Sequence, residues 1–375
     1  MSRKIDYTTR AVILSGRFPV ITYVSIQVNF WIVANILLAL ILHLQSLLIS
    51  TAIEIPVSGR LAPTILIAII FGIVYGVSLG LTDYYLDKKF FRKLPLGKVI
   101  LFKAAISLSV LILILTLMRF VLYDVLISPM LNFTLKHKSW EYLFYLLLVY
   151  YFFMTLMISF INQVNKKYGP GVLVPLLLGK YRNPREEERI FMFMDLKSST
   201  ATAEQLGHLK YSSFIRDCFM DINEILLPFR AEVYQYVGDE IVVTWRESEG
   251  LKNFTCIRFF FACKKKFLDR SGYYMTQYSF LPDFKAGLHT GKVSAVEIGE
   301  IKRDIAYHGD TLNTTARIQS VCNKYNKKLL ASEYILNKIK LKNGFKTESL
   351  GMIQLRGKTT TIEIASIEFD EANLN

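Results

Sequence analysis

Cysteine is scarce in this 375-residue sequence. Its four cysteines all lie in the second half, at Cys218, Cys256, Cys263 and Cys322. None forms a Cys-x-x-Cys pair, so nothing in their spacing indicates a disulfide framework or a thiolate zinc site. We therefore expect four small, buried side chains in a reducing compartment.

Acidic residues are nearly missing from the first half. Residues 1–180 hold 17 Lys and Arg but only 6 Asp and Glu, which is a net charge of +11 out of +14 for the chain. A basic chain raises the question of nucleic-acid binding. Here the basic residues flank long apolar runs, and 52% of the chain is hydrophobic, so we expect a membrane-lipid partner and no nucleic acid.

Four apolar runs contain no Asp, Glu or Arg in their middles. They predict membrane-spanning helices at about 22–46, 61–82, 99–121 and 141–162. Lys103, near the start of the third run, is expected to extend toward the membrane interface. Without charges at the midplane, an ion channel or a transporter is not favoured, and both a plain anchor and a sensor remain open.

The basic loops predict the orientation of these spans. The N-terminal segment and the loop after the second run are richest in Lys and Arg, so both termini are expected in the cytoplasm of a multi-pass cell-membrane protein. The N-terminal apolar run is too long for the core of a signal peptide. We predict a transmembrane domain at 1–164, a coupling segment broken by Gly and Pro at 165–188, and a second domain at 189–369.

The second domain reads as an α+β, ferredoxin-like fold. A buried strand from residue 189, a helix at 201–229, a hairpin at 231–245 and a helix at 254–268 begin the order β-α-β-β-α-β. Residues 284–299 are expected to form two strands around a His-Thr-Gly turn. A helix at 312–326, a strand at 329–332 and a final strand pair at 345–368 follow, with the helices on one face of an antiparallel sheet.

Two carboxylates fall at strand ends that this fold places side by side. Asp195 ends the first strand, and Asp239 lies in the hairpin turn Gly-Asp-Glu. Two carboxylates at one point repel each other unless a cation joins them, and Mg²⁺ binds through carboxylates and substrate phosphates. The pattern suggests a Mg²⁺–nucleotide site, although a turn Asp and a helix-capping Asp would explain the same residues.

Five separated motifs make the second domain resemble the class III nucleotidyl cyclases, the adenylate and guanylate cyclase homology domain. The resemblance covers roughly residues 188–368. In chain order the motifs are FMFMDLKSST, YQYVGDEIVV, FKAGLHTGKV, HGDTLNTTARI and LRGK. A diguanylate cyclase also carries a Gly-Asp-Glu hairpin, but it would lack the NTTAR helix and the LRGK segment.

The resemblance implies a role for each matching residue. Two Mg²⁺ or Mn²⁺ ions would be held by Asp195, Asp239 and the Leu196 carbonyl. The phosphates would be bound by the amides of Lys197, Ser198, Ser199 and Thr200, with Lys285 as a charged contact. The catalytic set would be Asn313 on the ribose, Arg317 on the α-phosphate and Lys358 on the phosphates. In the family these groups come from two subunits, which implies a homodimer with two sites.

The resemblance leaves the choice of nucleotide open. The two positions that read the base in the family are Gln235 and Ala306 here. Ala306 offers no polar group, and the amide of Gln235 can pair with either purine. No Glu is present at the first position to accept from guanine, so we favour an adenylate cyclase that makes 3′,5′-cyclic AMP and diphosphate from ATP. The alternatives are a guanylate cyclase and a degenerate receptor without activity.

Overall fold

The structure is a computed structural model, and it describes residues 18–54, 61–89, 95–117, 120, 137–168, 178–300, 303–339, 344–354 and 361–369. The chain divides into two compact units. We call residues 18–173 the helical unit and the part from residue 174 onward the sheet unit. Each unit is described by itself.

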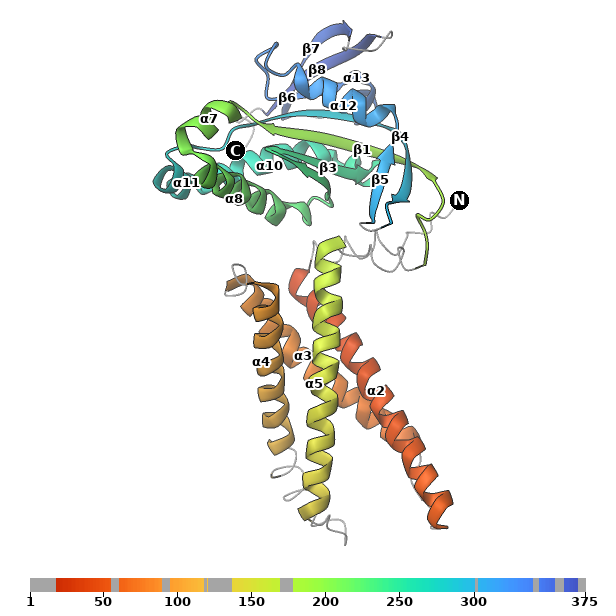
Figure 1. Cartoon of the computed structure of the whole chain (residues 1–375). Coiled ribbons are helices and arrows are strands. Elements are labelled where there is room, and N and C mark those ends of the chain that lie inside the picture. The colour runs from red at the N-terminus through yellow and green to blue at the C-terminus, as the bar shows by residue number, and fades with distance from the viewer. Residues whose placement is uncertain are drawn as a thin grey trace. The chain divides into compact units, whose positions relative to one another are not determined.

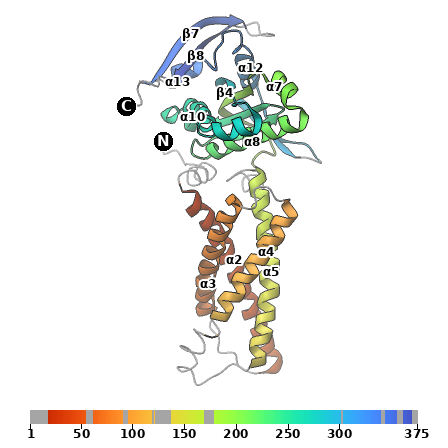
Figure 2. The ribbon, with the colours of Figure 1, turned by 90° about the vertical axis from the view of Figure 1, so that its left-hand side faces the viewer.

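The helical unit contains four long helices. They are α2 (Pro19–Ile53), α3 (Leu61–Lys89), α4 (Leu96–Leu117) and α5 (His137–Tyr168). Each includes an apolar stretch long enough to cross a bilayer, the shortest being 21 residues. The prediction of four long apolar helices, each a candidate membrane span, is therefore confirmed. Figure 2 shows α2 beside α3 and α4 beside α5.

Three glycines on α3 bring it into close contact with α2. A Cβ atom added at Gly72 would lie 2.7 Å from the Cα of Ile32, and one at Gly76 would lie 2.6 Å from the Cα of Val28. Gly80, one turn further along, meets the next turn of α2 in the same way. Small residues at a spacing of four let helix backbones pack closely in membranes. This pair of helices is therefore held by backbone contact.

The interior of the helical unit is aromatic and polar. Trp31, Tyr75 and Tyr151 are almost fully buried and pack ring against ring, with centroids 4.5–5.2 Å apart. The Tyr151 hydroxyl donates to Oδ1 of Asn35, which joins α5 to α2. The Tyr75 hydroxyl donates to the Ser107 carbonyl, which joins α3 to α4. Side-chain hydrogen bonds thus connect the helices in pairs.

Lys103 forms an ion pair within the helical unit. Its side chain is 4% exposed, and its Nζ lies 3.2 Å from Oδ2 of Asp83 on α3. Ionisable side chains in such helices commonly pair with one another. The sequence did not predict this partner, because Asp83 lies just beyond the apolar run.

The sheet unit contains one mixed sheet. Its order is β2-β3-β1-β4-β6-β8-β7, with β5 also paired to β4. The strands are β1 (Arg185–Leu196), β2 (Glu232–Val237), β3 (Glu240–Arg246), β4 (Phe284–Ile298), β5 (Asp304–His308), β6 (Leu329–Ser332), β7 (Phe345–Gln354) and β8 (Thr361–Phe369). Figure 2 shows β7 and β8 at the edge of the sheet.

The predicted ferredoxin-like core is confirmed. It runs β1, α7 (Ser199–Leu206), α8 (His208–Leu226), β2, β3, α10 (Thr255–Asp269), β4. Two further short helices, α9 (Glu247–Gly250) and α11 (Ser271–Tyr278), flank α10 with a short 3₁₀ turn at Lys252–Phe254. The first helix was expected to be continuous, but it is divided at Gly207, whose φ of +71° interrupts helical geometry.

Helices lie on both faces of this sheet, although one face was expected. Alternate β1 residues, such as Ile190 and Met192, share a core with α8, α10 and α13 (Glu333–Ile339). Phe191 lies on the other face, in a cluster with Leu312 of α12 (Asp310–Ser320). Figure 1 shows α12 across the sheet from α8 and α10. The expectation considered only the two core helices, whereas α12 belongs to the extension after β4.

The expected turn at His289–Gly291 is also wrong. Residues 284–298 form one continuous strand, in which Thr290 pairs with Ile190 and Gly291 with Arg189. Position 291 requires a glycine, because a Cβ atom there would lie 2.6 Å from Oγ1 of Thr311. The glycine makes room for α12 and does not reverse the chain. A separate strand, β5, pairs with the far end of β4.

The core of the sheet unit buries all four cysteines, as expected. Burial raises the pKa of the Cys256 thiol to about 12, so this thiol is inert. Two carboxylates of α8 are buried as well. Asp217 accepts hydrogen bonds from the hydroxyls of Tyr273 and Tyr278, and Asp221 accepts one from Tyr274. These bonds attach α11 to α8.

Candidate active site

Three acidic residues lie close together where β1 ends beside the β2–β3 hairpin. Asp195 of β1 is the cross-strand partner of Glu240, the first residue of β3. Asp239 precedes it in the hairpin turn, where Gly238 has a φ of +62°. The hairpin therefore delivers its acidic residues to the strand that carries Asp195, as the sequence predicted.

Burial and the neighbouring negative charges change the pKa of Glu240. Desolvation, followed by the charges of Asp195 and Asp239, raises its pKa to about 7. Such a corner favours a cation, and oxygen ligands of this kind suit Mg²⁺ or Mn²⁺. The donor set thus fits the divalent metal implied by the sequence. Among the described residues, no group of three or more His, Cys, Asp or Glu has the arrangement of a complete metal cage.

Lys285 provides a positive charge at this corner. It is the cross-strand partner of Asp195 on β4, and its Nζ lies 3.1 Å from Oδ2 of Asp195. Its side chain is only 14% exposed. Because the ion pair is largely shielded from water, it is stronger than a surface pair. The sequence suggested a phosphate contact for Lys285, and the structure places it against the carboxylate.

The turn between β1 and α7 lies next to Asp195. Leu196 buries its side chain in the core, so only its main chain remains for a ligand. The Lys197 amide already donates to the carbonyl of Asp283 at 2.8 Å, which removes it from the expected set of phosphate-binding amides. Ser198 has a φ of +57° and precedes Ser199, where α7 begins. The amides of residues 198–200 remain suited to an anion.

Helix α12 carries Asn313 and Arg317 on one face, since residues four apart lie one above the other. Asn313 is exposed and Arg317 is partly exposed. The opposite face lies close to β4, because a Cβ atom at Gly287 would be 2.4 Å from the Gln319 nitrogen and 2.7 Å from the Thr315 carbonyl. The two glycines of GLHTG therefore determine how near α12 approaches the sheet.

The two positions that the resemblance assigns to base reading, Gln235 and Ala306, lie on adjacent parts of the sheet unit. Gln235 is exposed on β2, just after a bulge, and Ala306 is 7% exposed on β5. Their neighbours are in contact, because the Tyr307 amide donates to the hydroxyl of Tyr234 and the two rings lie 5.1 Å apart. This contact holds β2 and β5 together.

The comparisons with known proteins bear on this unit. Residues 182–366 match the family model of the adenylate and guanylate cyclase catalytic domain. Adenylate cyclase 2 of Rhizobium meliloti (strain 1021) is 32% identical over 210 residues, which cover 56% of this chain and 58% of that protein. Residues 182–366 are a class III nucleotidyl cyclase domain. The chain spans little more than half the length of this curated relative.

Solved cyclase structures are similar to the same part of the chain. The adenylyl cyclase CyaB from P. aeruginosa is 16% identical, with a TM-score of 0.45 over 52% of this chain and 100% of that one. A bacterial light-regulated adenylyl cyclase is 20% identical, with a TM-score of 0.48 over 56% of this chain and 62% of that one. The guanylate cyclase domain of RhGC from Catenaria anguillulae is 15% identical, with a TM-score of 0.41 over 50% of this chain and 100% of that one.

Two residues of the cyclase domain escaped the sequence prediction. Gln319 donates from Nε2 to Oδ2 of Asp195 at 3.1 Å. Tyr211 of α8 lies beside the carboxylates, where burial and the charge of Asp239 raise its pKa while a hydrogen bond with Ser199 opposes the shift. No local pattern in the sequence points to either residue. Gln319 lies two positions after Arg317, about 200° around the helix, so it faces away from the residues that the motif marks.

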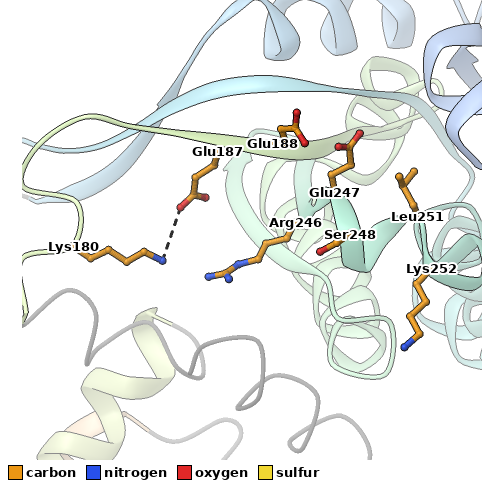
Figure 3. A pocket seen from close by; sticks show the side chains of 8 residues that line it. All are labelled: Lys180, Glu187, Glu188, Arg246, Glu247, Ser248, Leu251 and Lys252. Atoms are coloured by element: carbon orange, nitrogen blue, oxygen red, sulfur yellow. Dashed lines mark ion pairs between the residues drawn. The ribbon is translucent and has the colours of Figure 1, made fainter. Parts of the chain in front are cut away.

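The predicted phosphate contact Lys358 falls outside the described residues. A hollow of about 690 Å³ lies at the other end of β1, and Figure 3 shows the eight side chains that line it, including the ion pair of Lys180 with Glu187. None of the predicted site residues lines this hollow.

Proposed function

We propose that this protein is a membrane-anchored adenylate cyclase that converts ATP to 3′,5′-cyclic AMP and diphosphate. The observation that carries the proposal is the meeting of Asp195, Asp239 and Glu240 beside the turn into α7, within a domain that matches the cyclase family. A crowded carboxylate corner next to free helix amides is suited to a metal–triphosphate complex.

The proposed roles follow from the resemblance of these motifs to the cyclase family. Asp195, Asp239 and the Leu196 carbonyl would hold two Mg²⁺ or Mn²⁺ ions, which would supply activation of the ribose 3′-hydroxyl and neutralisation of triphosphate charge. The amides of residues 198–200 would bind phosphate oxygens. From the second subunit, Asn313 orients the ribose and Arg317 donates to the α-phosphate as charge develops there. Lys358 is proposed to contact the phosphates of the nucleotide.

The preference for ATP is supported by the base-reading positions. Gln235 offers an amide, which can donate and accept, and Ala306 is nearly buried and apolar. The name of the curated relative, Adenylate cyclase 2, points the same way. A guanylate cyclase is the second candidate, since a Gln amide can also pair with guanine.

The proposal includes the arrangement of the whole chain. Asn313 and Arg317 lie on the face of α12 turned away from Asp195, so a homodimer is needed to bring both sets to one nucleotide. We place both termini in the cytoplasm, on the basis of the charged loops. Residues 165–188 act as the coupling segment between transmembrane domain 1–164 and catalytic domain 189–369.

The decisive experiment is product identification. The full-length protein, purified in detergent, is incubated with Mn²⁺ or Mg²⁺ and with ATP or GTP, and the nucleotides are separated by chromatography with mass detection. We expect cyclic AMP from ATP. Cyclic GMP as the dominant product would establish the guanylate alternative. No cyclic product from dimeric protein would support a receptor with a degenerate cyclase domain.

A further inference from the structure

Gln319 occupies an unusual position in the cyclase domain. It lies in the last turn of α12, it is 6% exposed, and its amide nitrogen is 3.1 Å from Oδ2 of Asp195. Lys285 Nζ reaches the same oxygen at 3.1 Å. Two donors on one oxygen fix the rotation of the carboxylate. Only the lysine brings a charge, so the role of the glutamine is geometric.

The backbone around Gln319 leaves it little freedom. Gly287 allows the main chain of Gln319 to touch β4, where a Cβ atom would come within 2.4 Å of the Gln319 nitrogen. One turn earlier, Thr315 lies against the same glycine, and the Thr311 hydroxyl donates to the Lys292 carbonyl at 2.9 Å. The inner face of α12 is therefore attached to β4 along its length.

The two faces of α12 point to different places. Asn313 and Arg317 form the outer face, and Thr311, Thr315 and Gln319 form the inner face, about 180° away at 100° per residue. The inner face contacts the carboxylate of its own chain. Under the proposed function, the outer face serves the site whose carboxylates belong to the partner. One helix thus touches both sites of the dimer.

We propose that Gln319 is a positioning residue: it orients the Asp195 carboxylate for metal binding, and it connects α12 to the metal site of its own chain. The inference rests on the proposed function. Partners that orient a metal ligand typically affect metal affinity by about 10- to 100-fold. Loss of the Gln319 amide should therefore weaken metal binding in the site that contains its own Asp195.

The first test measures binding without turnover. Full-length wild type, Gln319→Met and Asp195→Ala are titrated with Mn²⁺ in the presence of 3′-deoxy-ATP, which lacks the attacking hydroxyl, and free Mn²⁺ is followed by its electron paramagnetic resonance signal. Methionine has similar length and no donor. We expect the Mn²⁺ dissociation constant to rise about 10-fold in Gln319→Met. Gln277→Met, on an exposed position of α11, is the matched control and should match wild type.

The second test separates positioning from damage to the helix. A subunit with Asn313→Ala keeps Asp195, and a subunit with Asp195→Ala keeps Asn313, so a mixture has one complete site. Gln319→Met is added to the first subunit in one mixture and to the second in another. Both mixtures contain the same altered helix. We expect the Mn²⁺ concentration for half-maximal activity to rise only when Gln319→Met shares a chain with the intact Asp195.

The outcomes separate this inference from the proposed function. Unchanged Mn²⁺ binding in Gln319→Met, with binding lost in Asp195→Ala, overturns the role of Gln319 alone. An equal rise in both mixtures also overturns it, because the effect would then be a general one on α12. If Asp195→Ala binds Mn²⁺ as wild type does, the metal site of the proposed function is wrong.

Discussion

At the scale of single residues, the hairpin Asp239 is the clearest case of a turn residue with a second use. Gly and Asp are common in hairpin turns for conformational reasons alone. In this protein the turn also puts Asp239 near Asp195, and burial together with the charges of these two residues raises the pKa of Glu240 to about 7. The same two-residue turn therefore determines both the strand register and the local charge.

Asp239→Asn separates these two uses. Asparagine is as good a turn residue, so we expect an unchanged melting temperature. Cyclase activity should fall by at least about 100-fold. Losing a residue that only orients a metal ligand already costs up to about 100-fold, and Asp239 is itself a proposed ligand. Activity at saturating Mn²⁺ is the measurement, and Asp269→Asn on an exposed position of α10 is the control. A variant with the wild-type rate would disprove the metal role.

The lowered pKa of the Asp217 carboxyl predicts how the stability of the folded protein depends on pH. Desolvation would raise the pKa of Asp217, but hydrogen bonds from Tyr278, Tyr273 and Arg216 outweigh it, and the pKa is lowered. A lowered pKa in the folded state stabilises above the unfolded value of about 4, and this stability is lost as pH falls through the folded value.

The test compares melting temperatures of the detergent-solubilised chain from pH 7 to pH 3. We expect Asp217→Asn to melt lower at pH 7, by the equivalent of about 1–3 kcal/mol for weakened charged hydrogen bonds. Below pH 4 the difference in melting temperature between Asp217→Asn and wild type should become smaller, because the wild-type carboxylate becomes protonated and loses its charge. A gap that stays constant across this range would show that the charge of Asp217 does not contribute.

At the scale of elements, the ferredoxin-like core was predictable because its helices and strands have strong periodicity. The face of α8 that contains Ile215 and Ile222 is buried as expected. The interpretation of the glycine in the His-Thr-Gly segment was wrong. The sequence shows Gly291 as a turn, whereas it serves the close approach of α12, and that contact joins residues 20 apart that no local pattern connects. Tyr211 and Gln319 were missed for the same reason.

Gly287→Ala tests the contact between α12 and β4. The added methyl would meet backbone atoms of Thr315 and Gln319 at 2.7 Å and 2.4 Å, so the helix has to shift. We expect a loss of about 1–3 kcal/mol in stability and at least about a 10-fold loss in activity.

Two matched glycines serve as controls for this substitution. Gly291→Ala meets a threonine side chain and should cost less, and Gly272→Ala has nothing within 4 Å and should cost nothing. Melting temperature and cyclic nucleotide production are measured for all three. If Gly287→Ala behaves like Gly272→Ala, close packing of α12 is not needed.

At the scale of the whole molecule, the sequence predicted a division into a membrane part and a cyclase part, and it predicted the four spans. It could not predict the interior of the membrane part, where Lys103 pairs with Asp83 and three aromatic rings pack together. Those contacts depend on how the helices pack, and apolar runs carry no information on packing. The family match covers only the second half.

Mixing inactive subunits tests the shared site. Asp195→Ala and Asn313→Ala homodimers should each be nearly inactive, because each lacks one half of both sites. After co-expression, half of the dimers are mixed and each has one complete site, so activity should recover to about a quarter of wild type. Cyclic AMP production is the measurement, and co-expression of Asp195→Ala with Asp239→Asn is the control. A mixture as inactive as its parents would refute the shared site.

The strand β1 has a mechanical consequence. It has 12 residues, about 40 Å of extended chain, and it leads without interruption from Arg185, in the last part of the proposed coupling segment, to Asp195. It is held by β4 along its whole length and by β3 over its second half. A pull or twist at residue 185 therefore cannot slide this strand past its neighbours, and we expect it to turn the catalytic half as a rigid piece. In the proposed homodimer, regulation would then change the angle between the two catalytic domains.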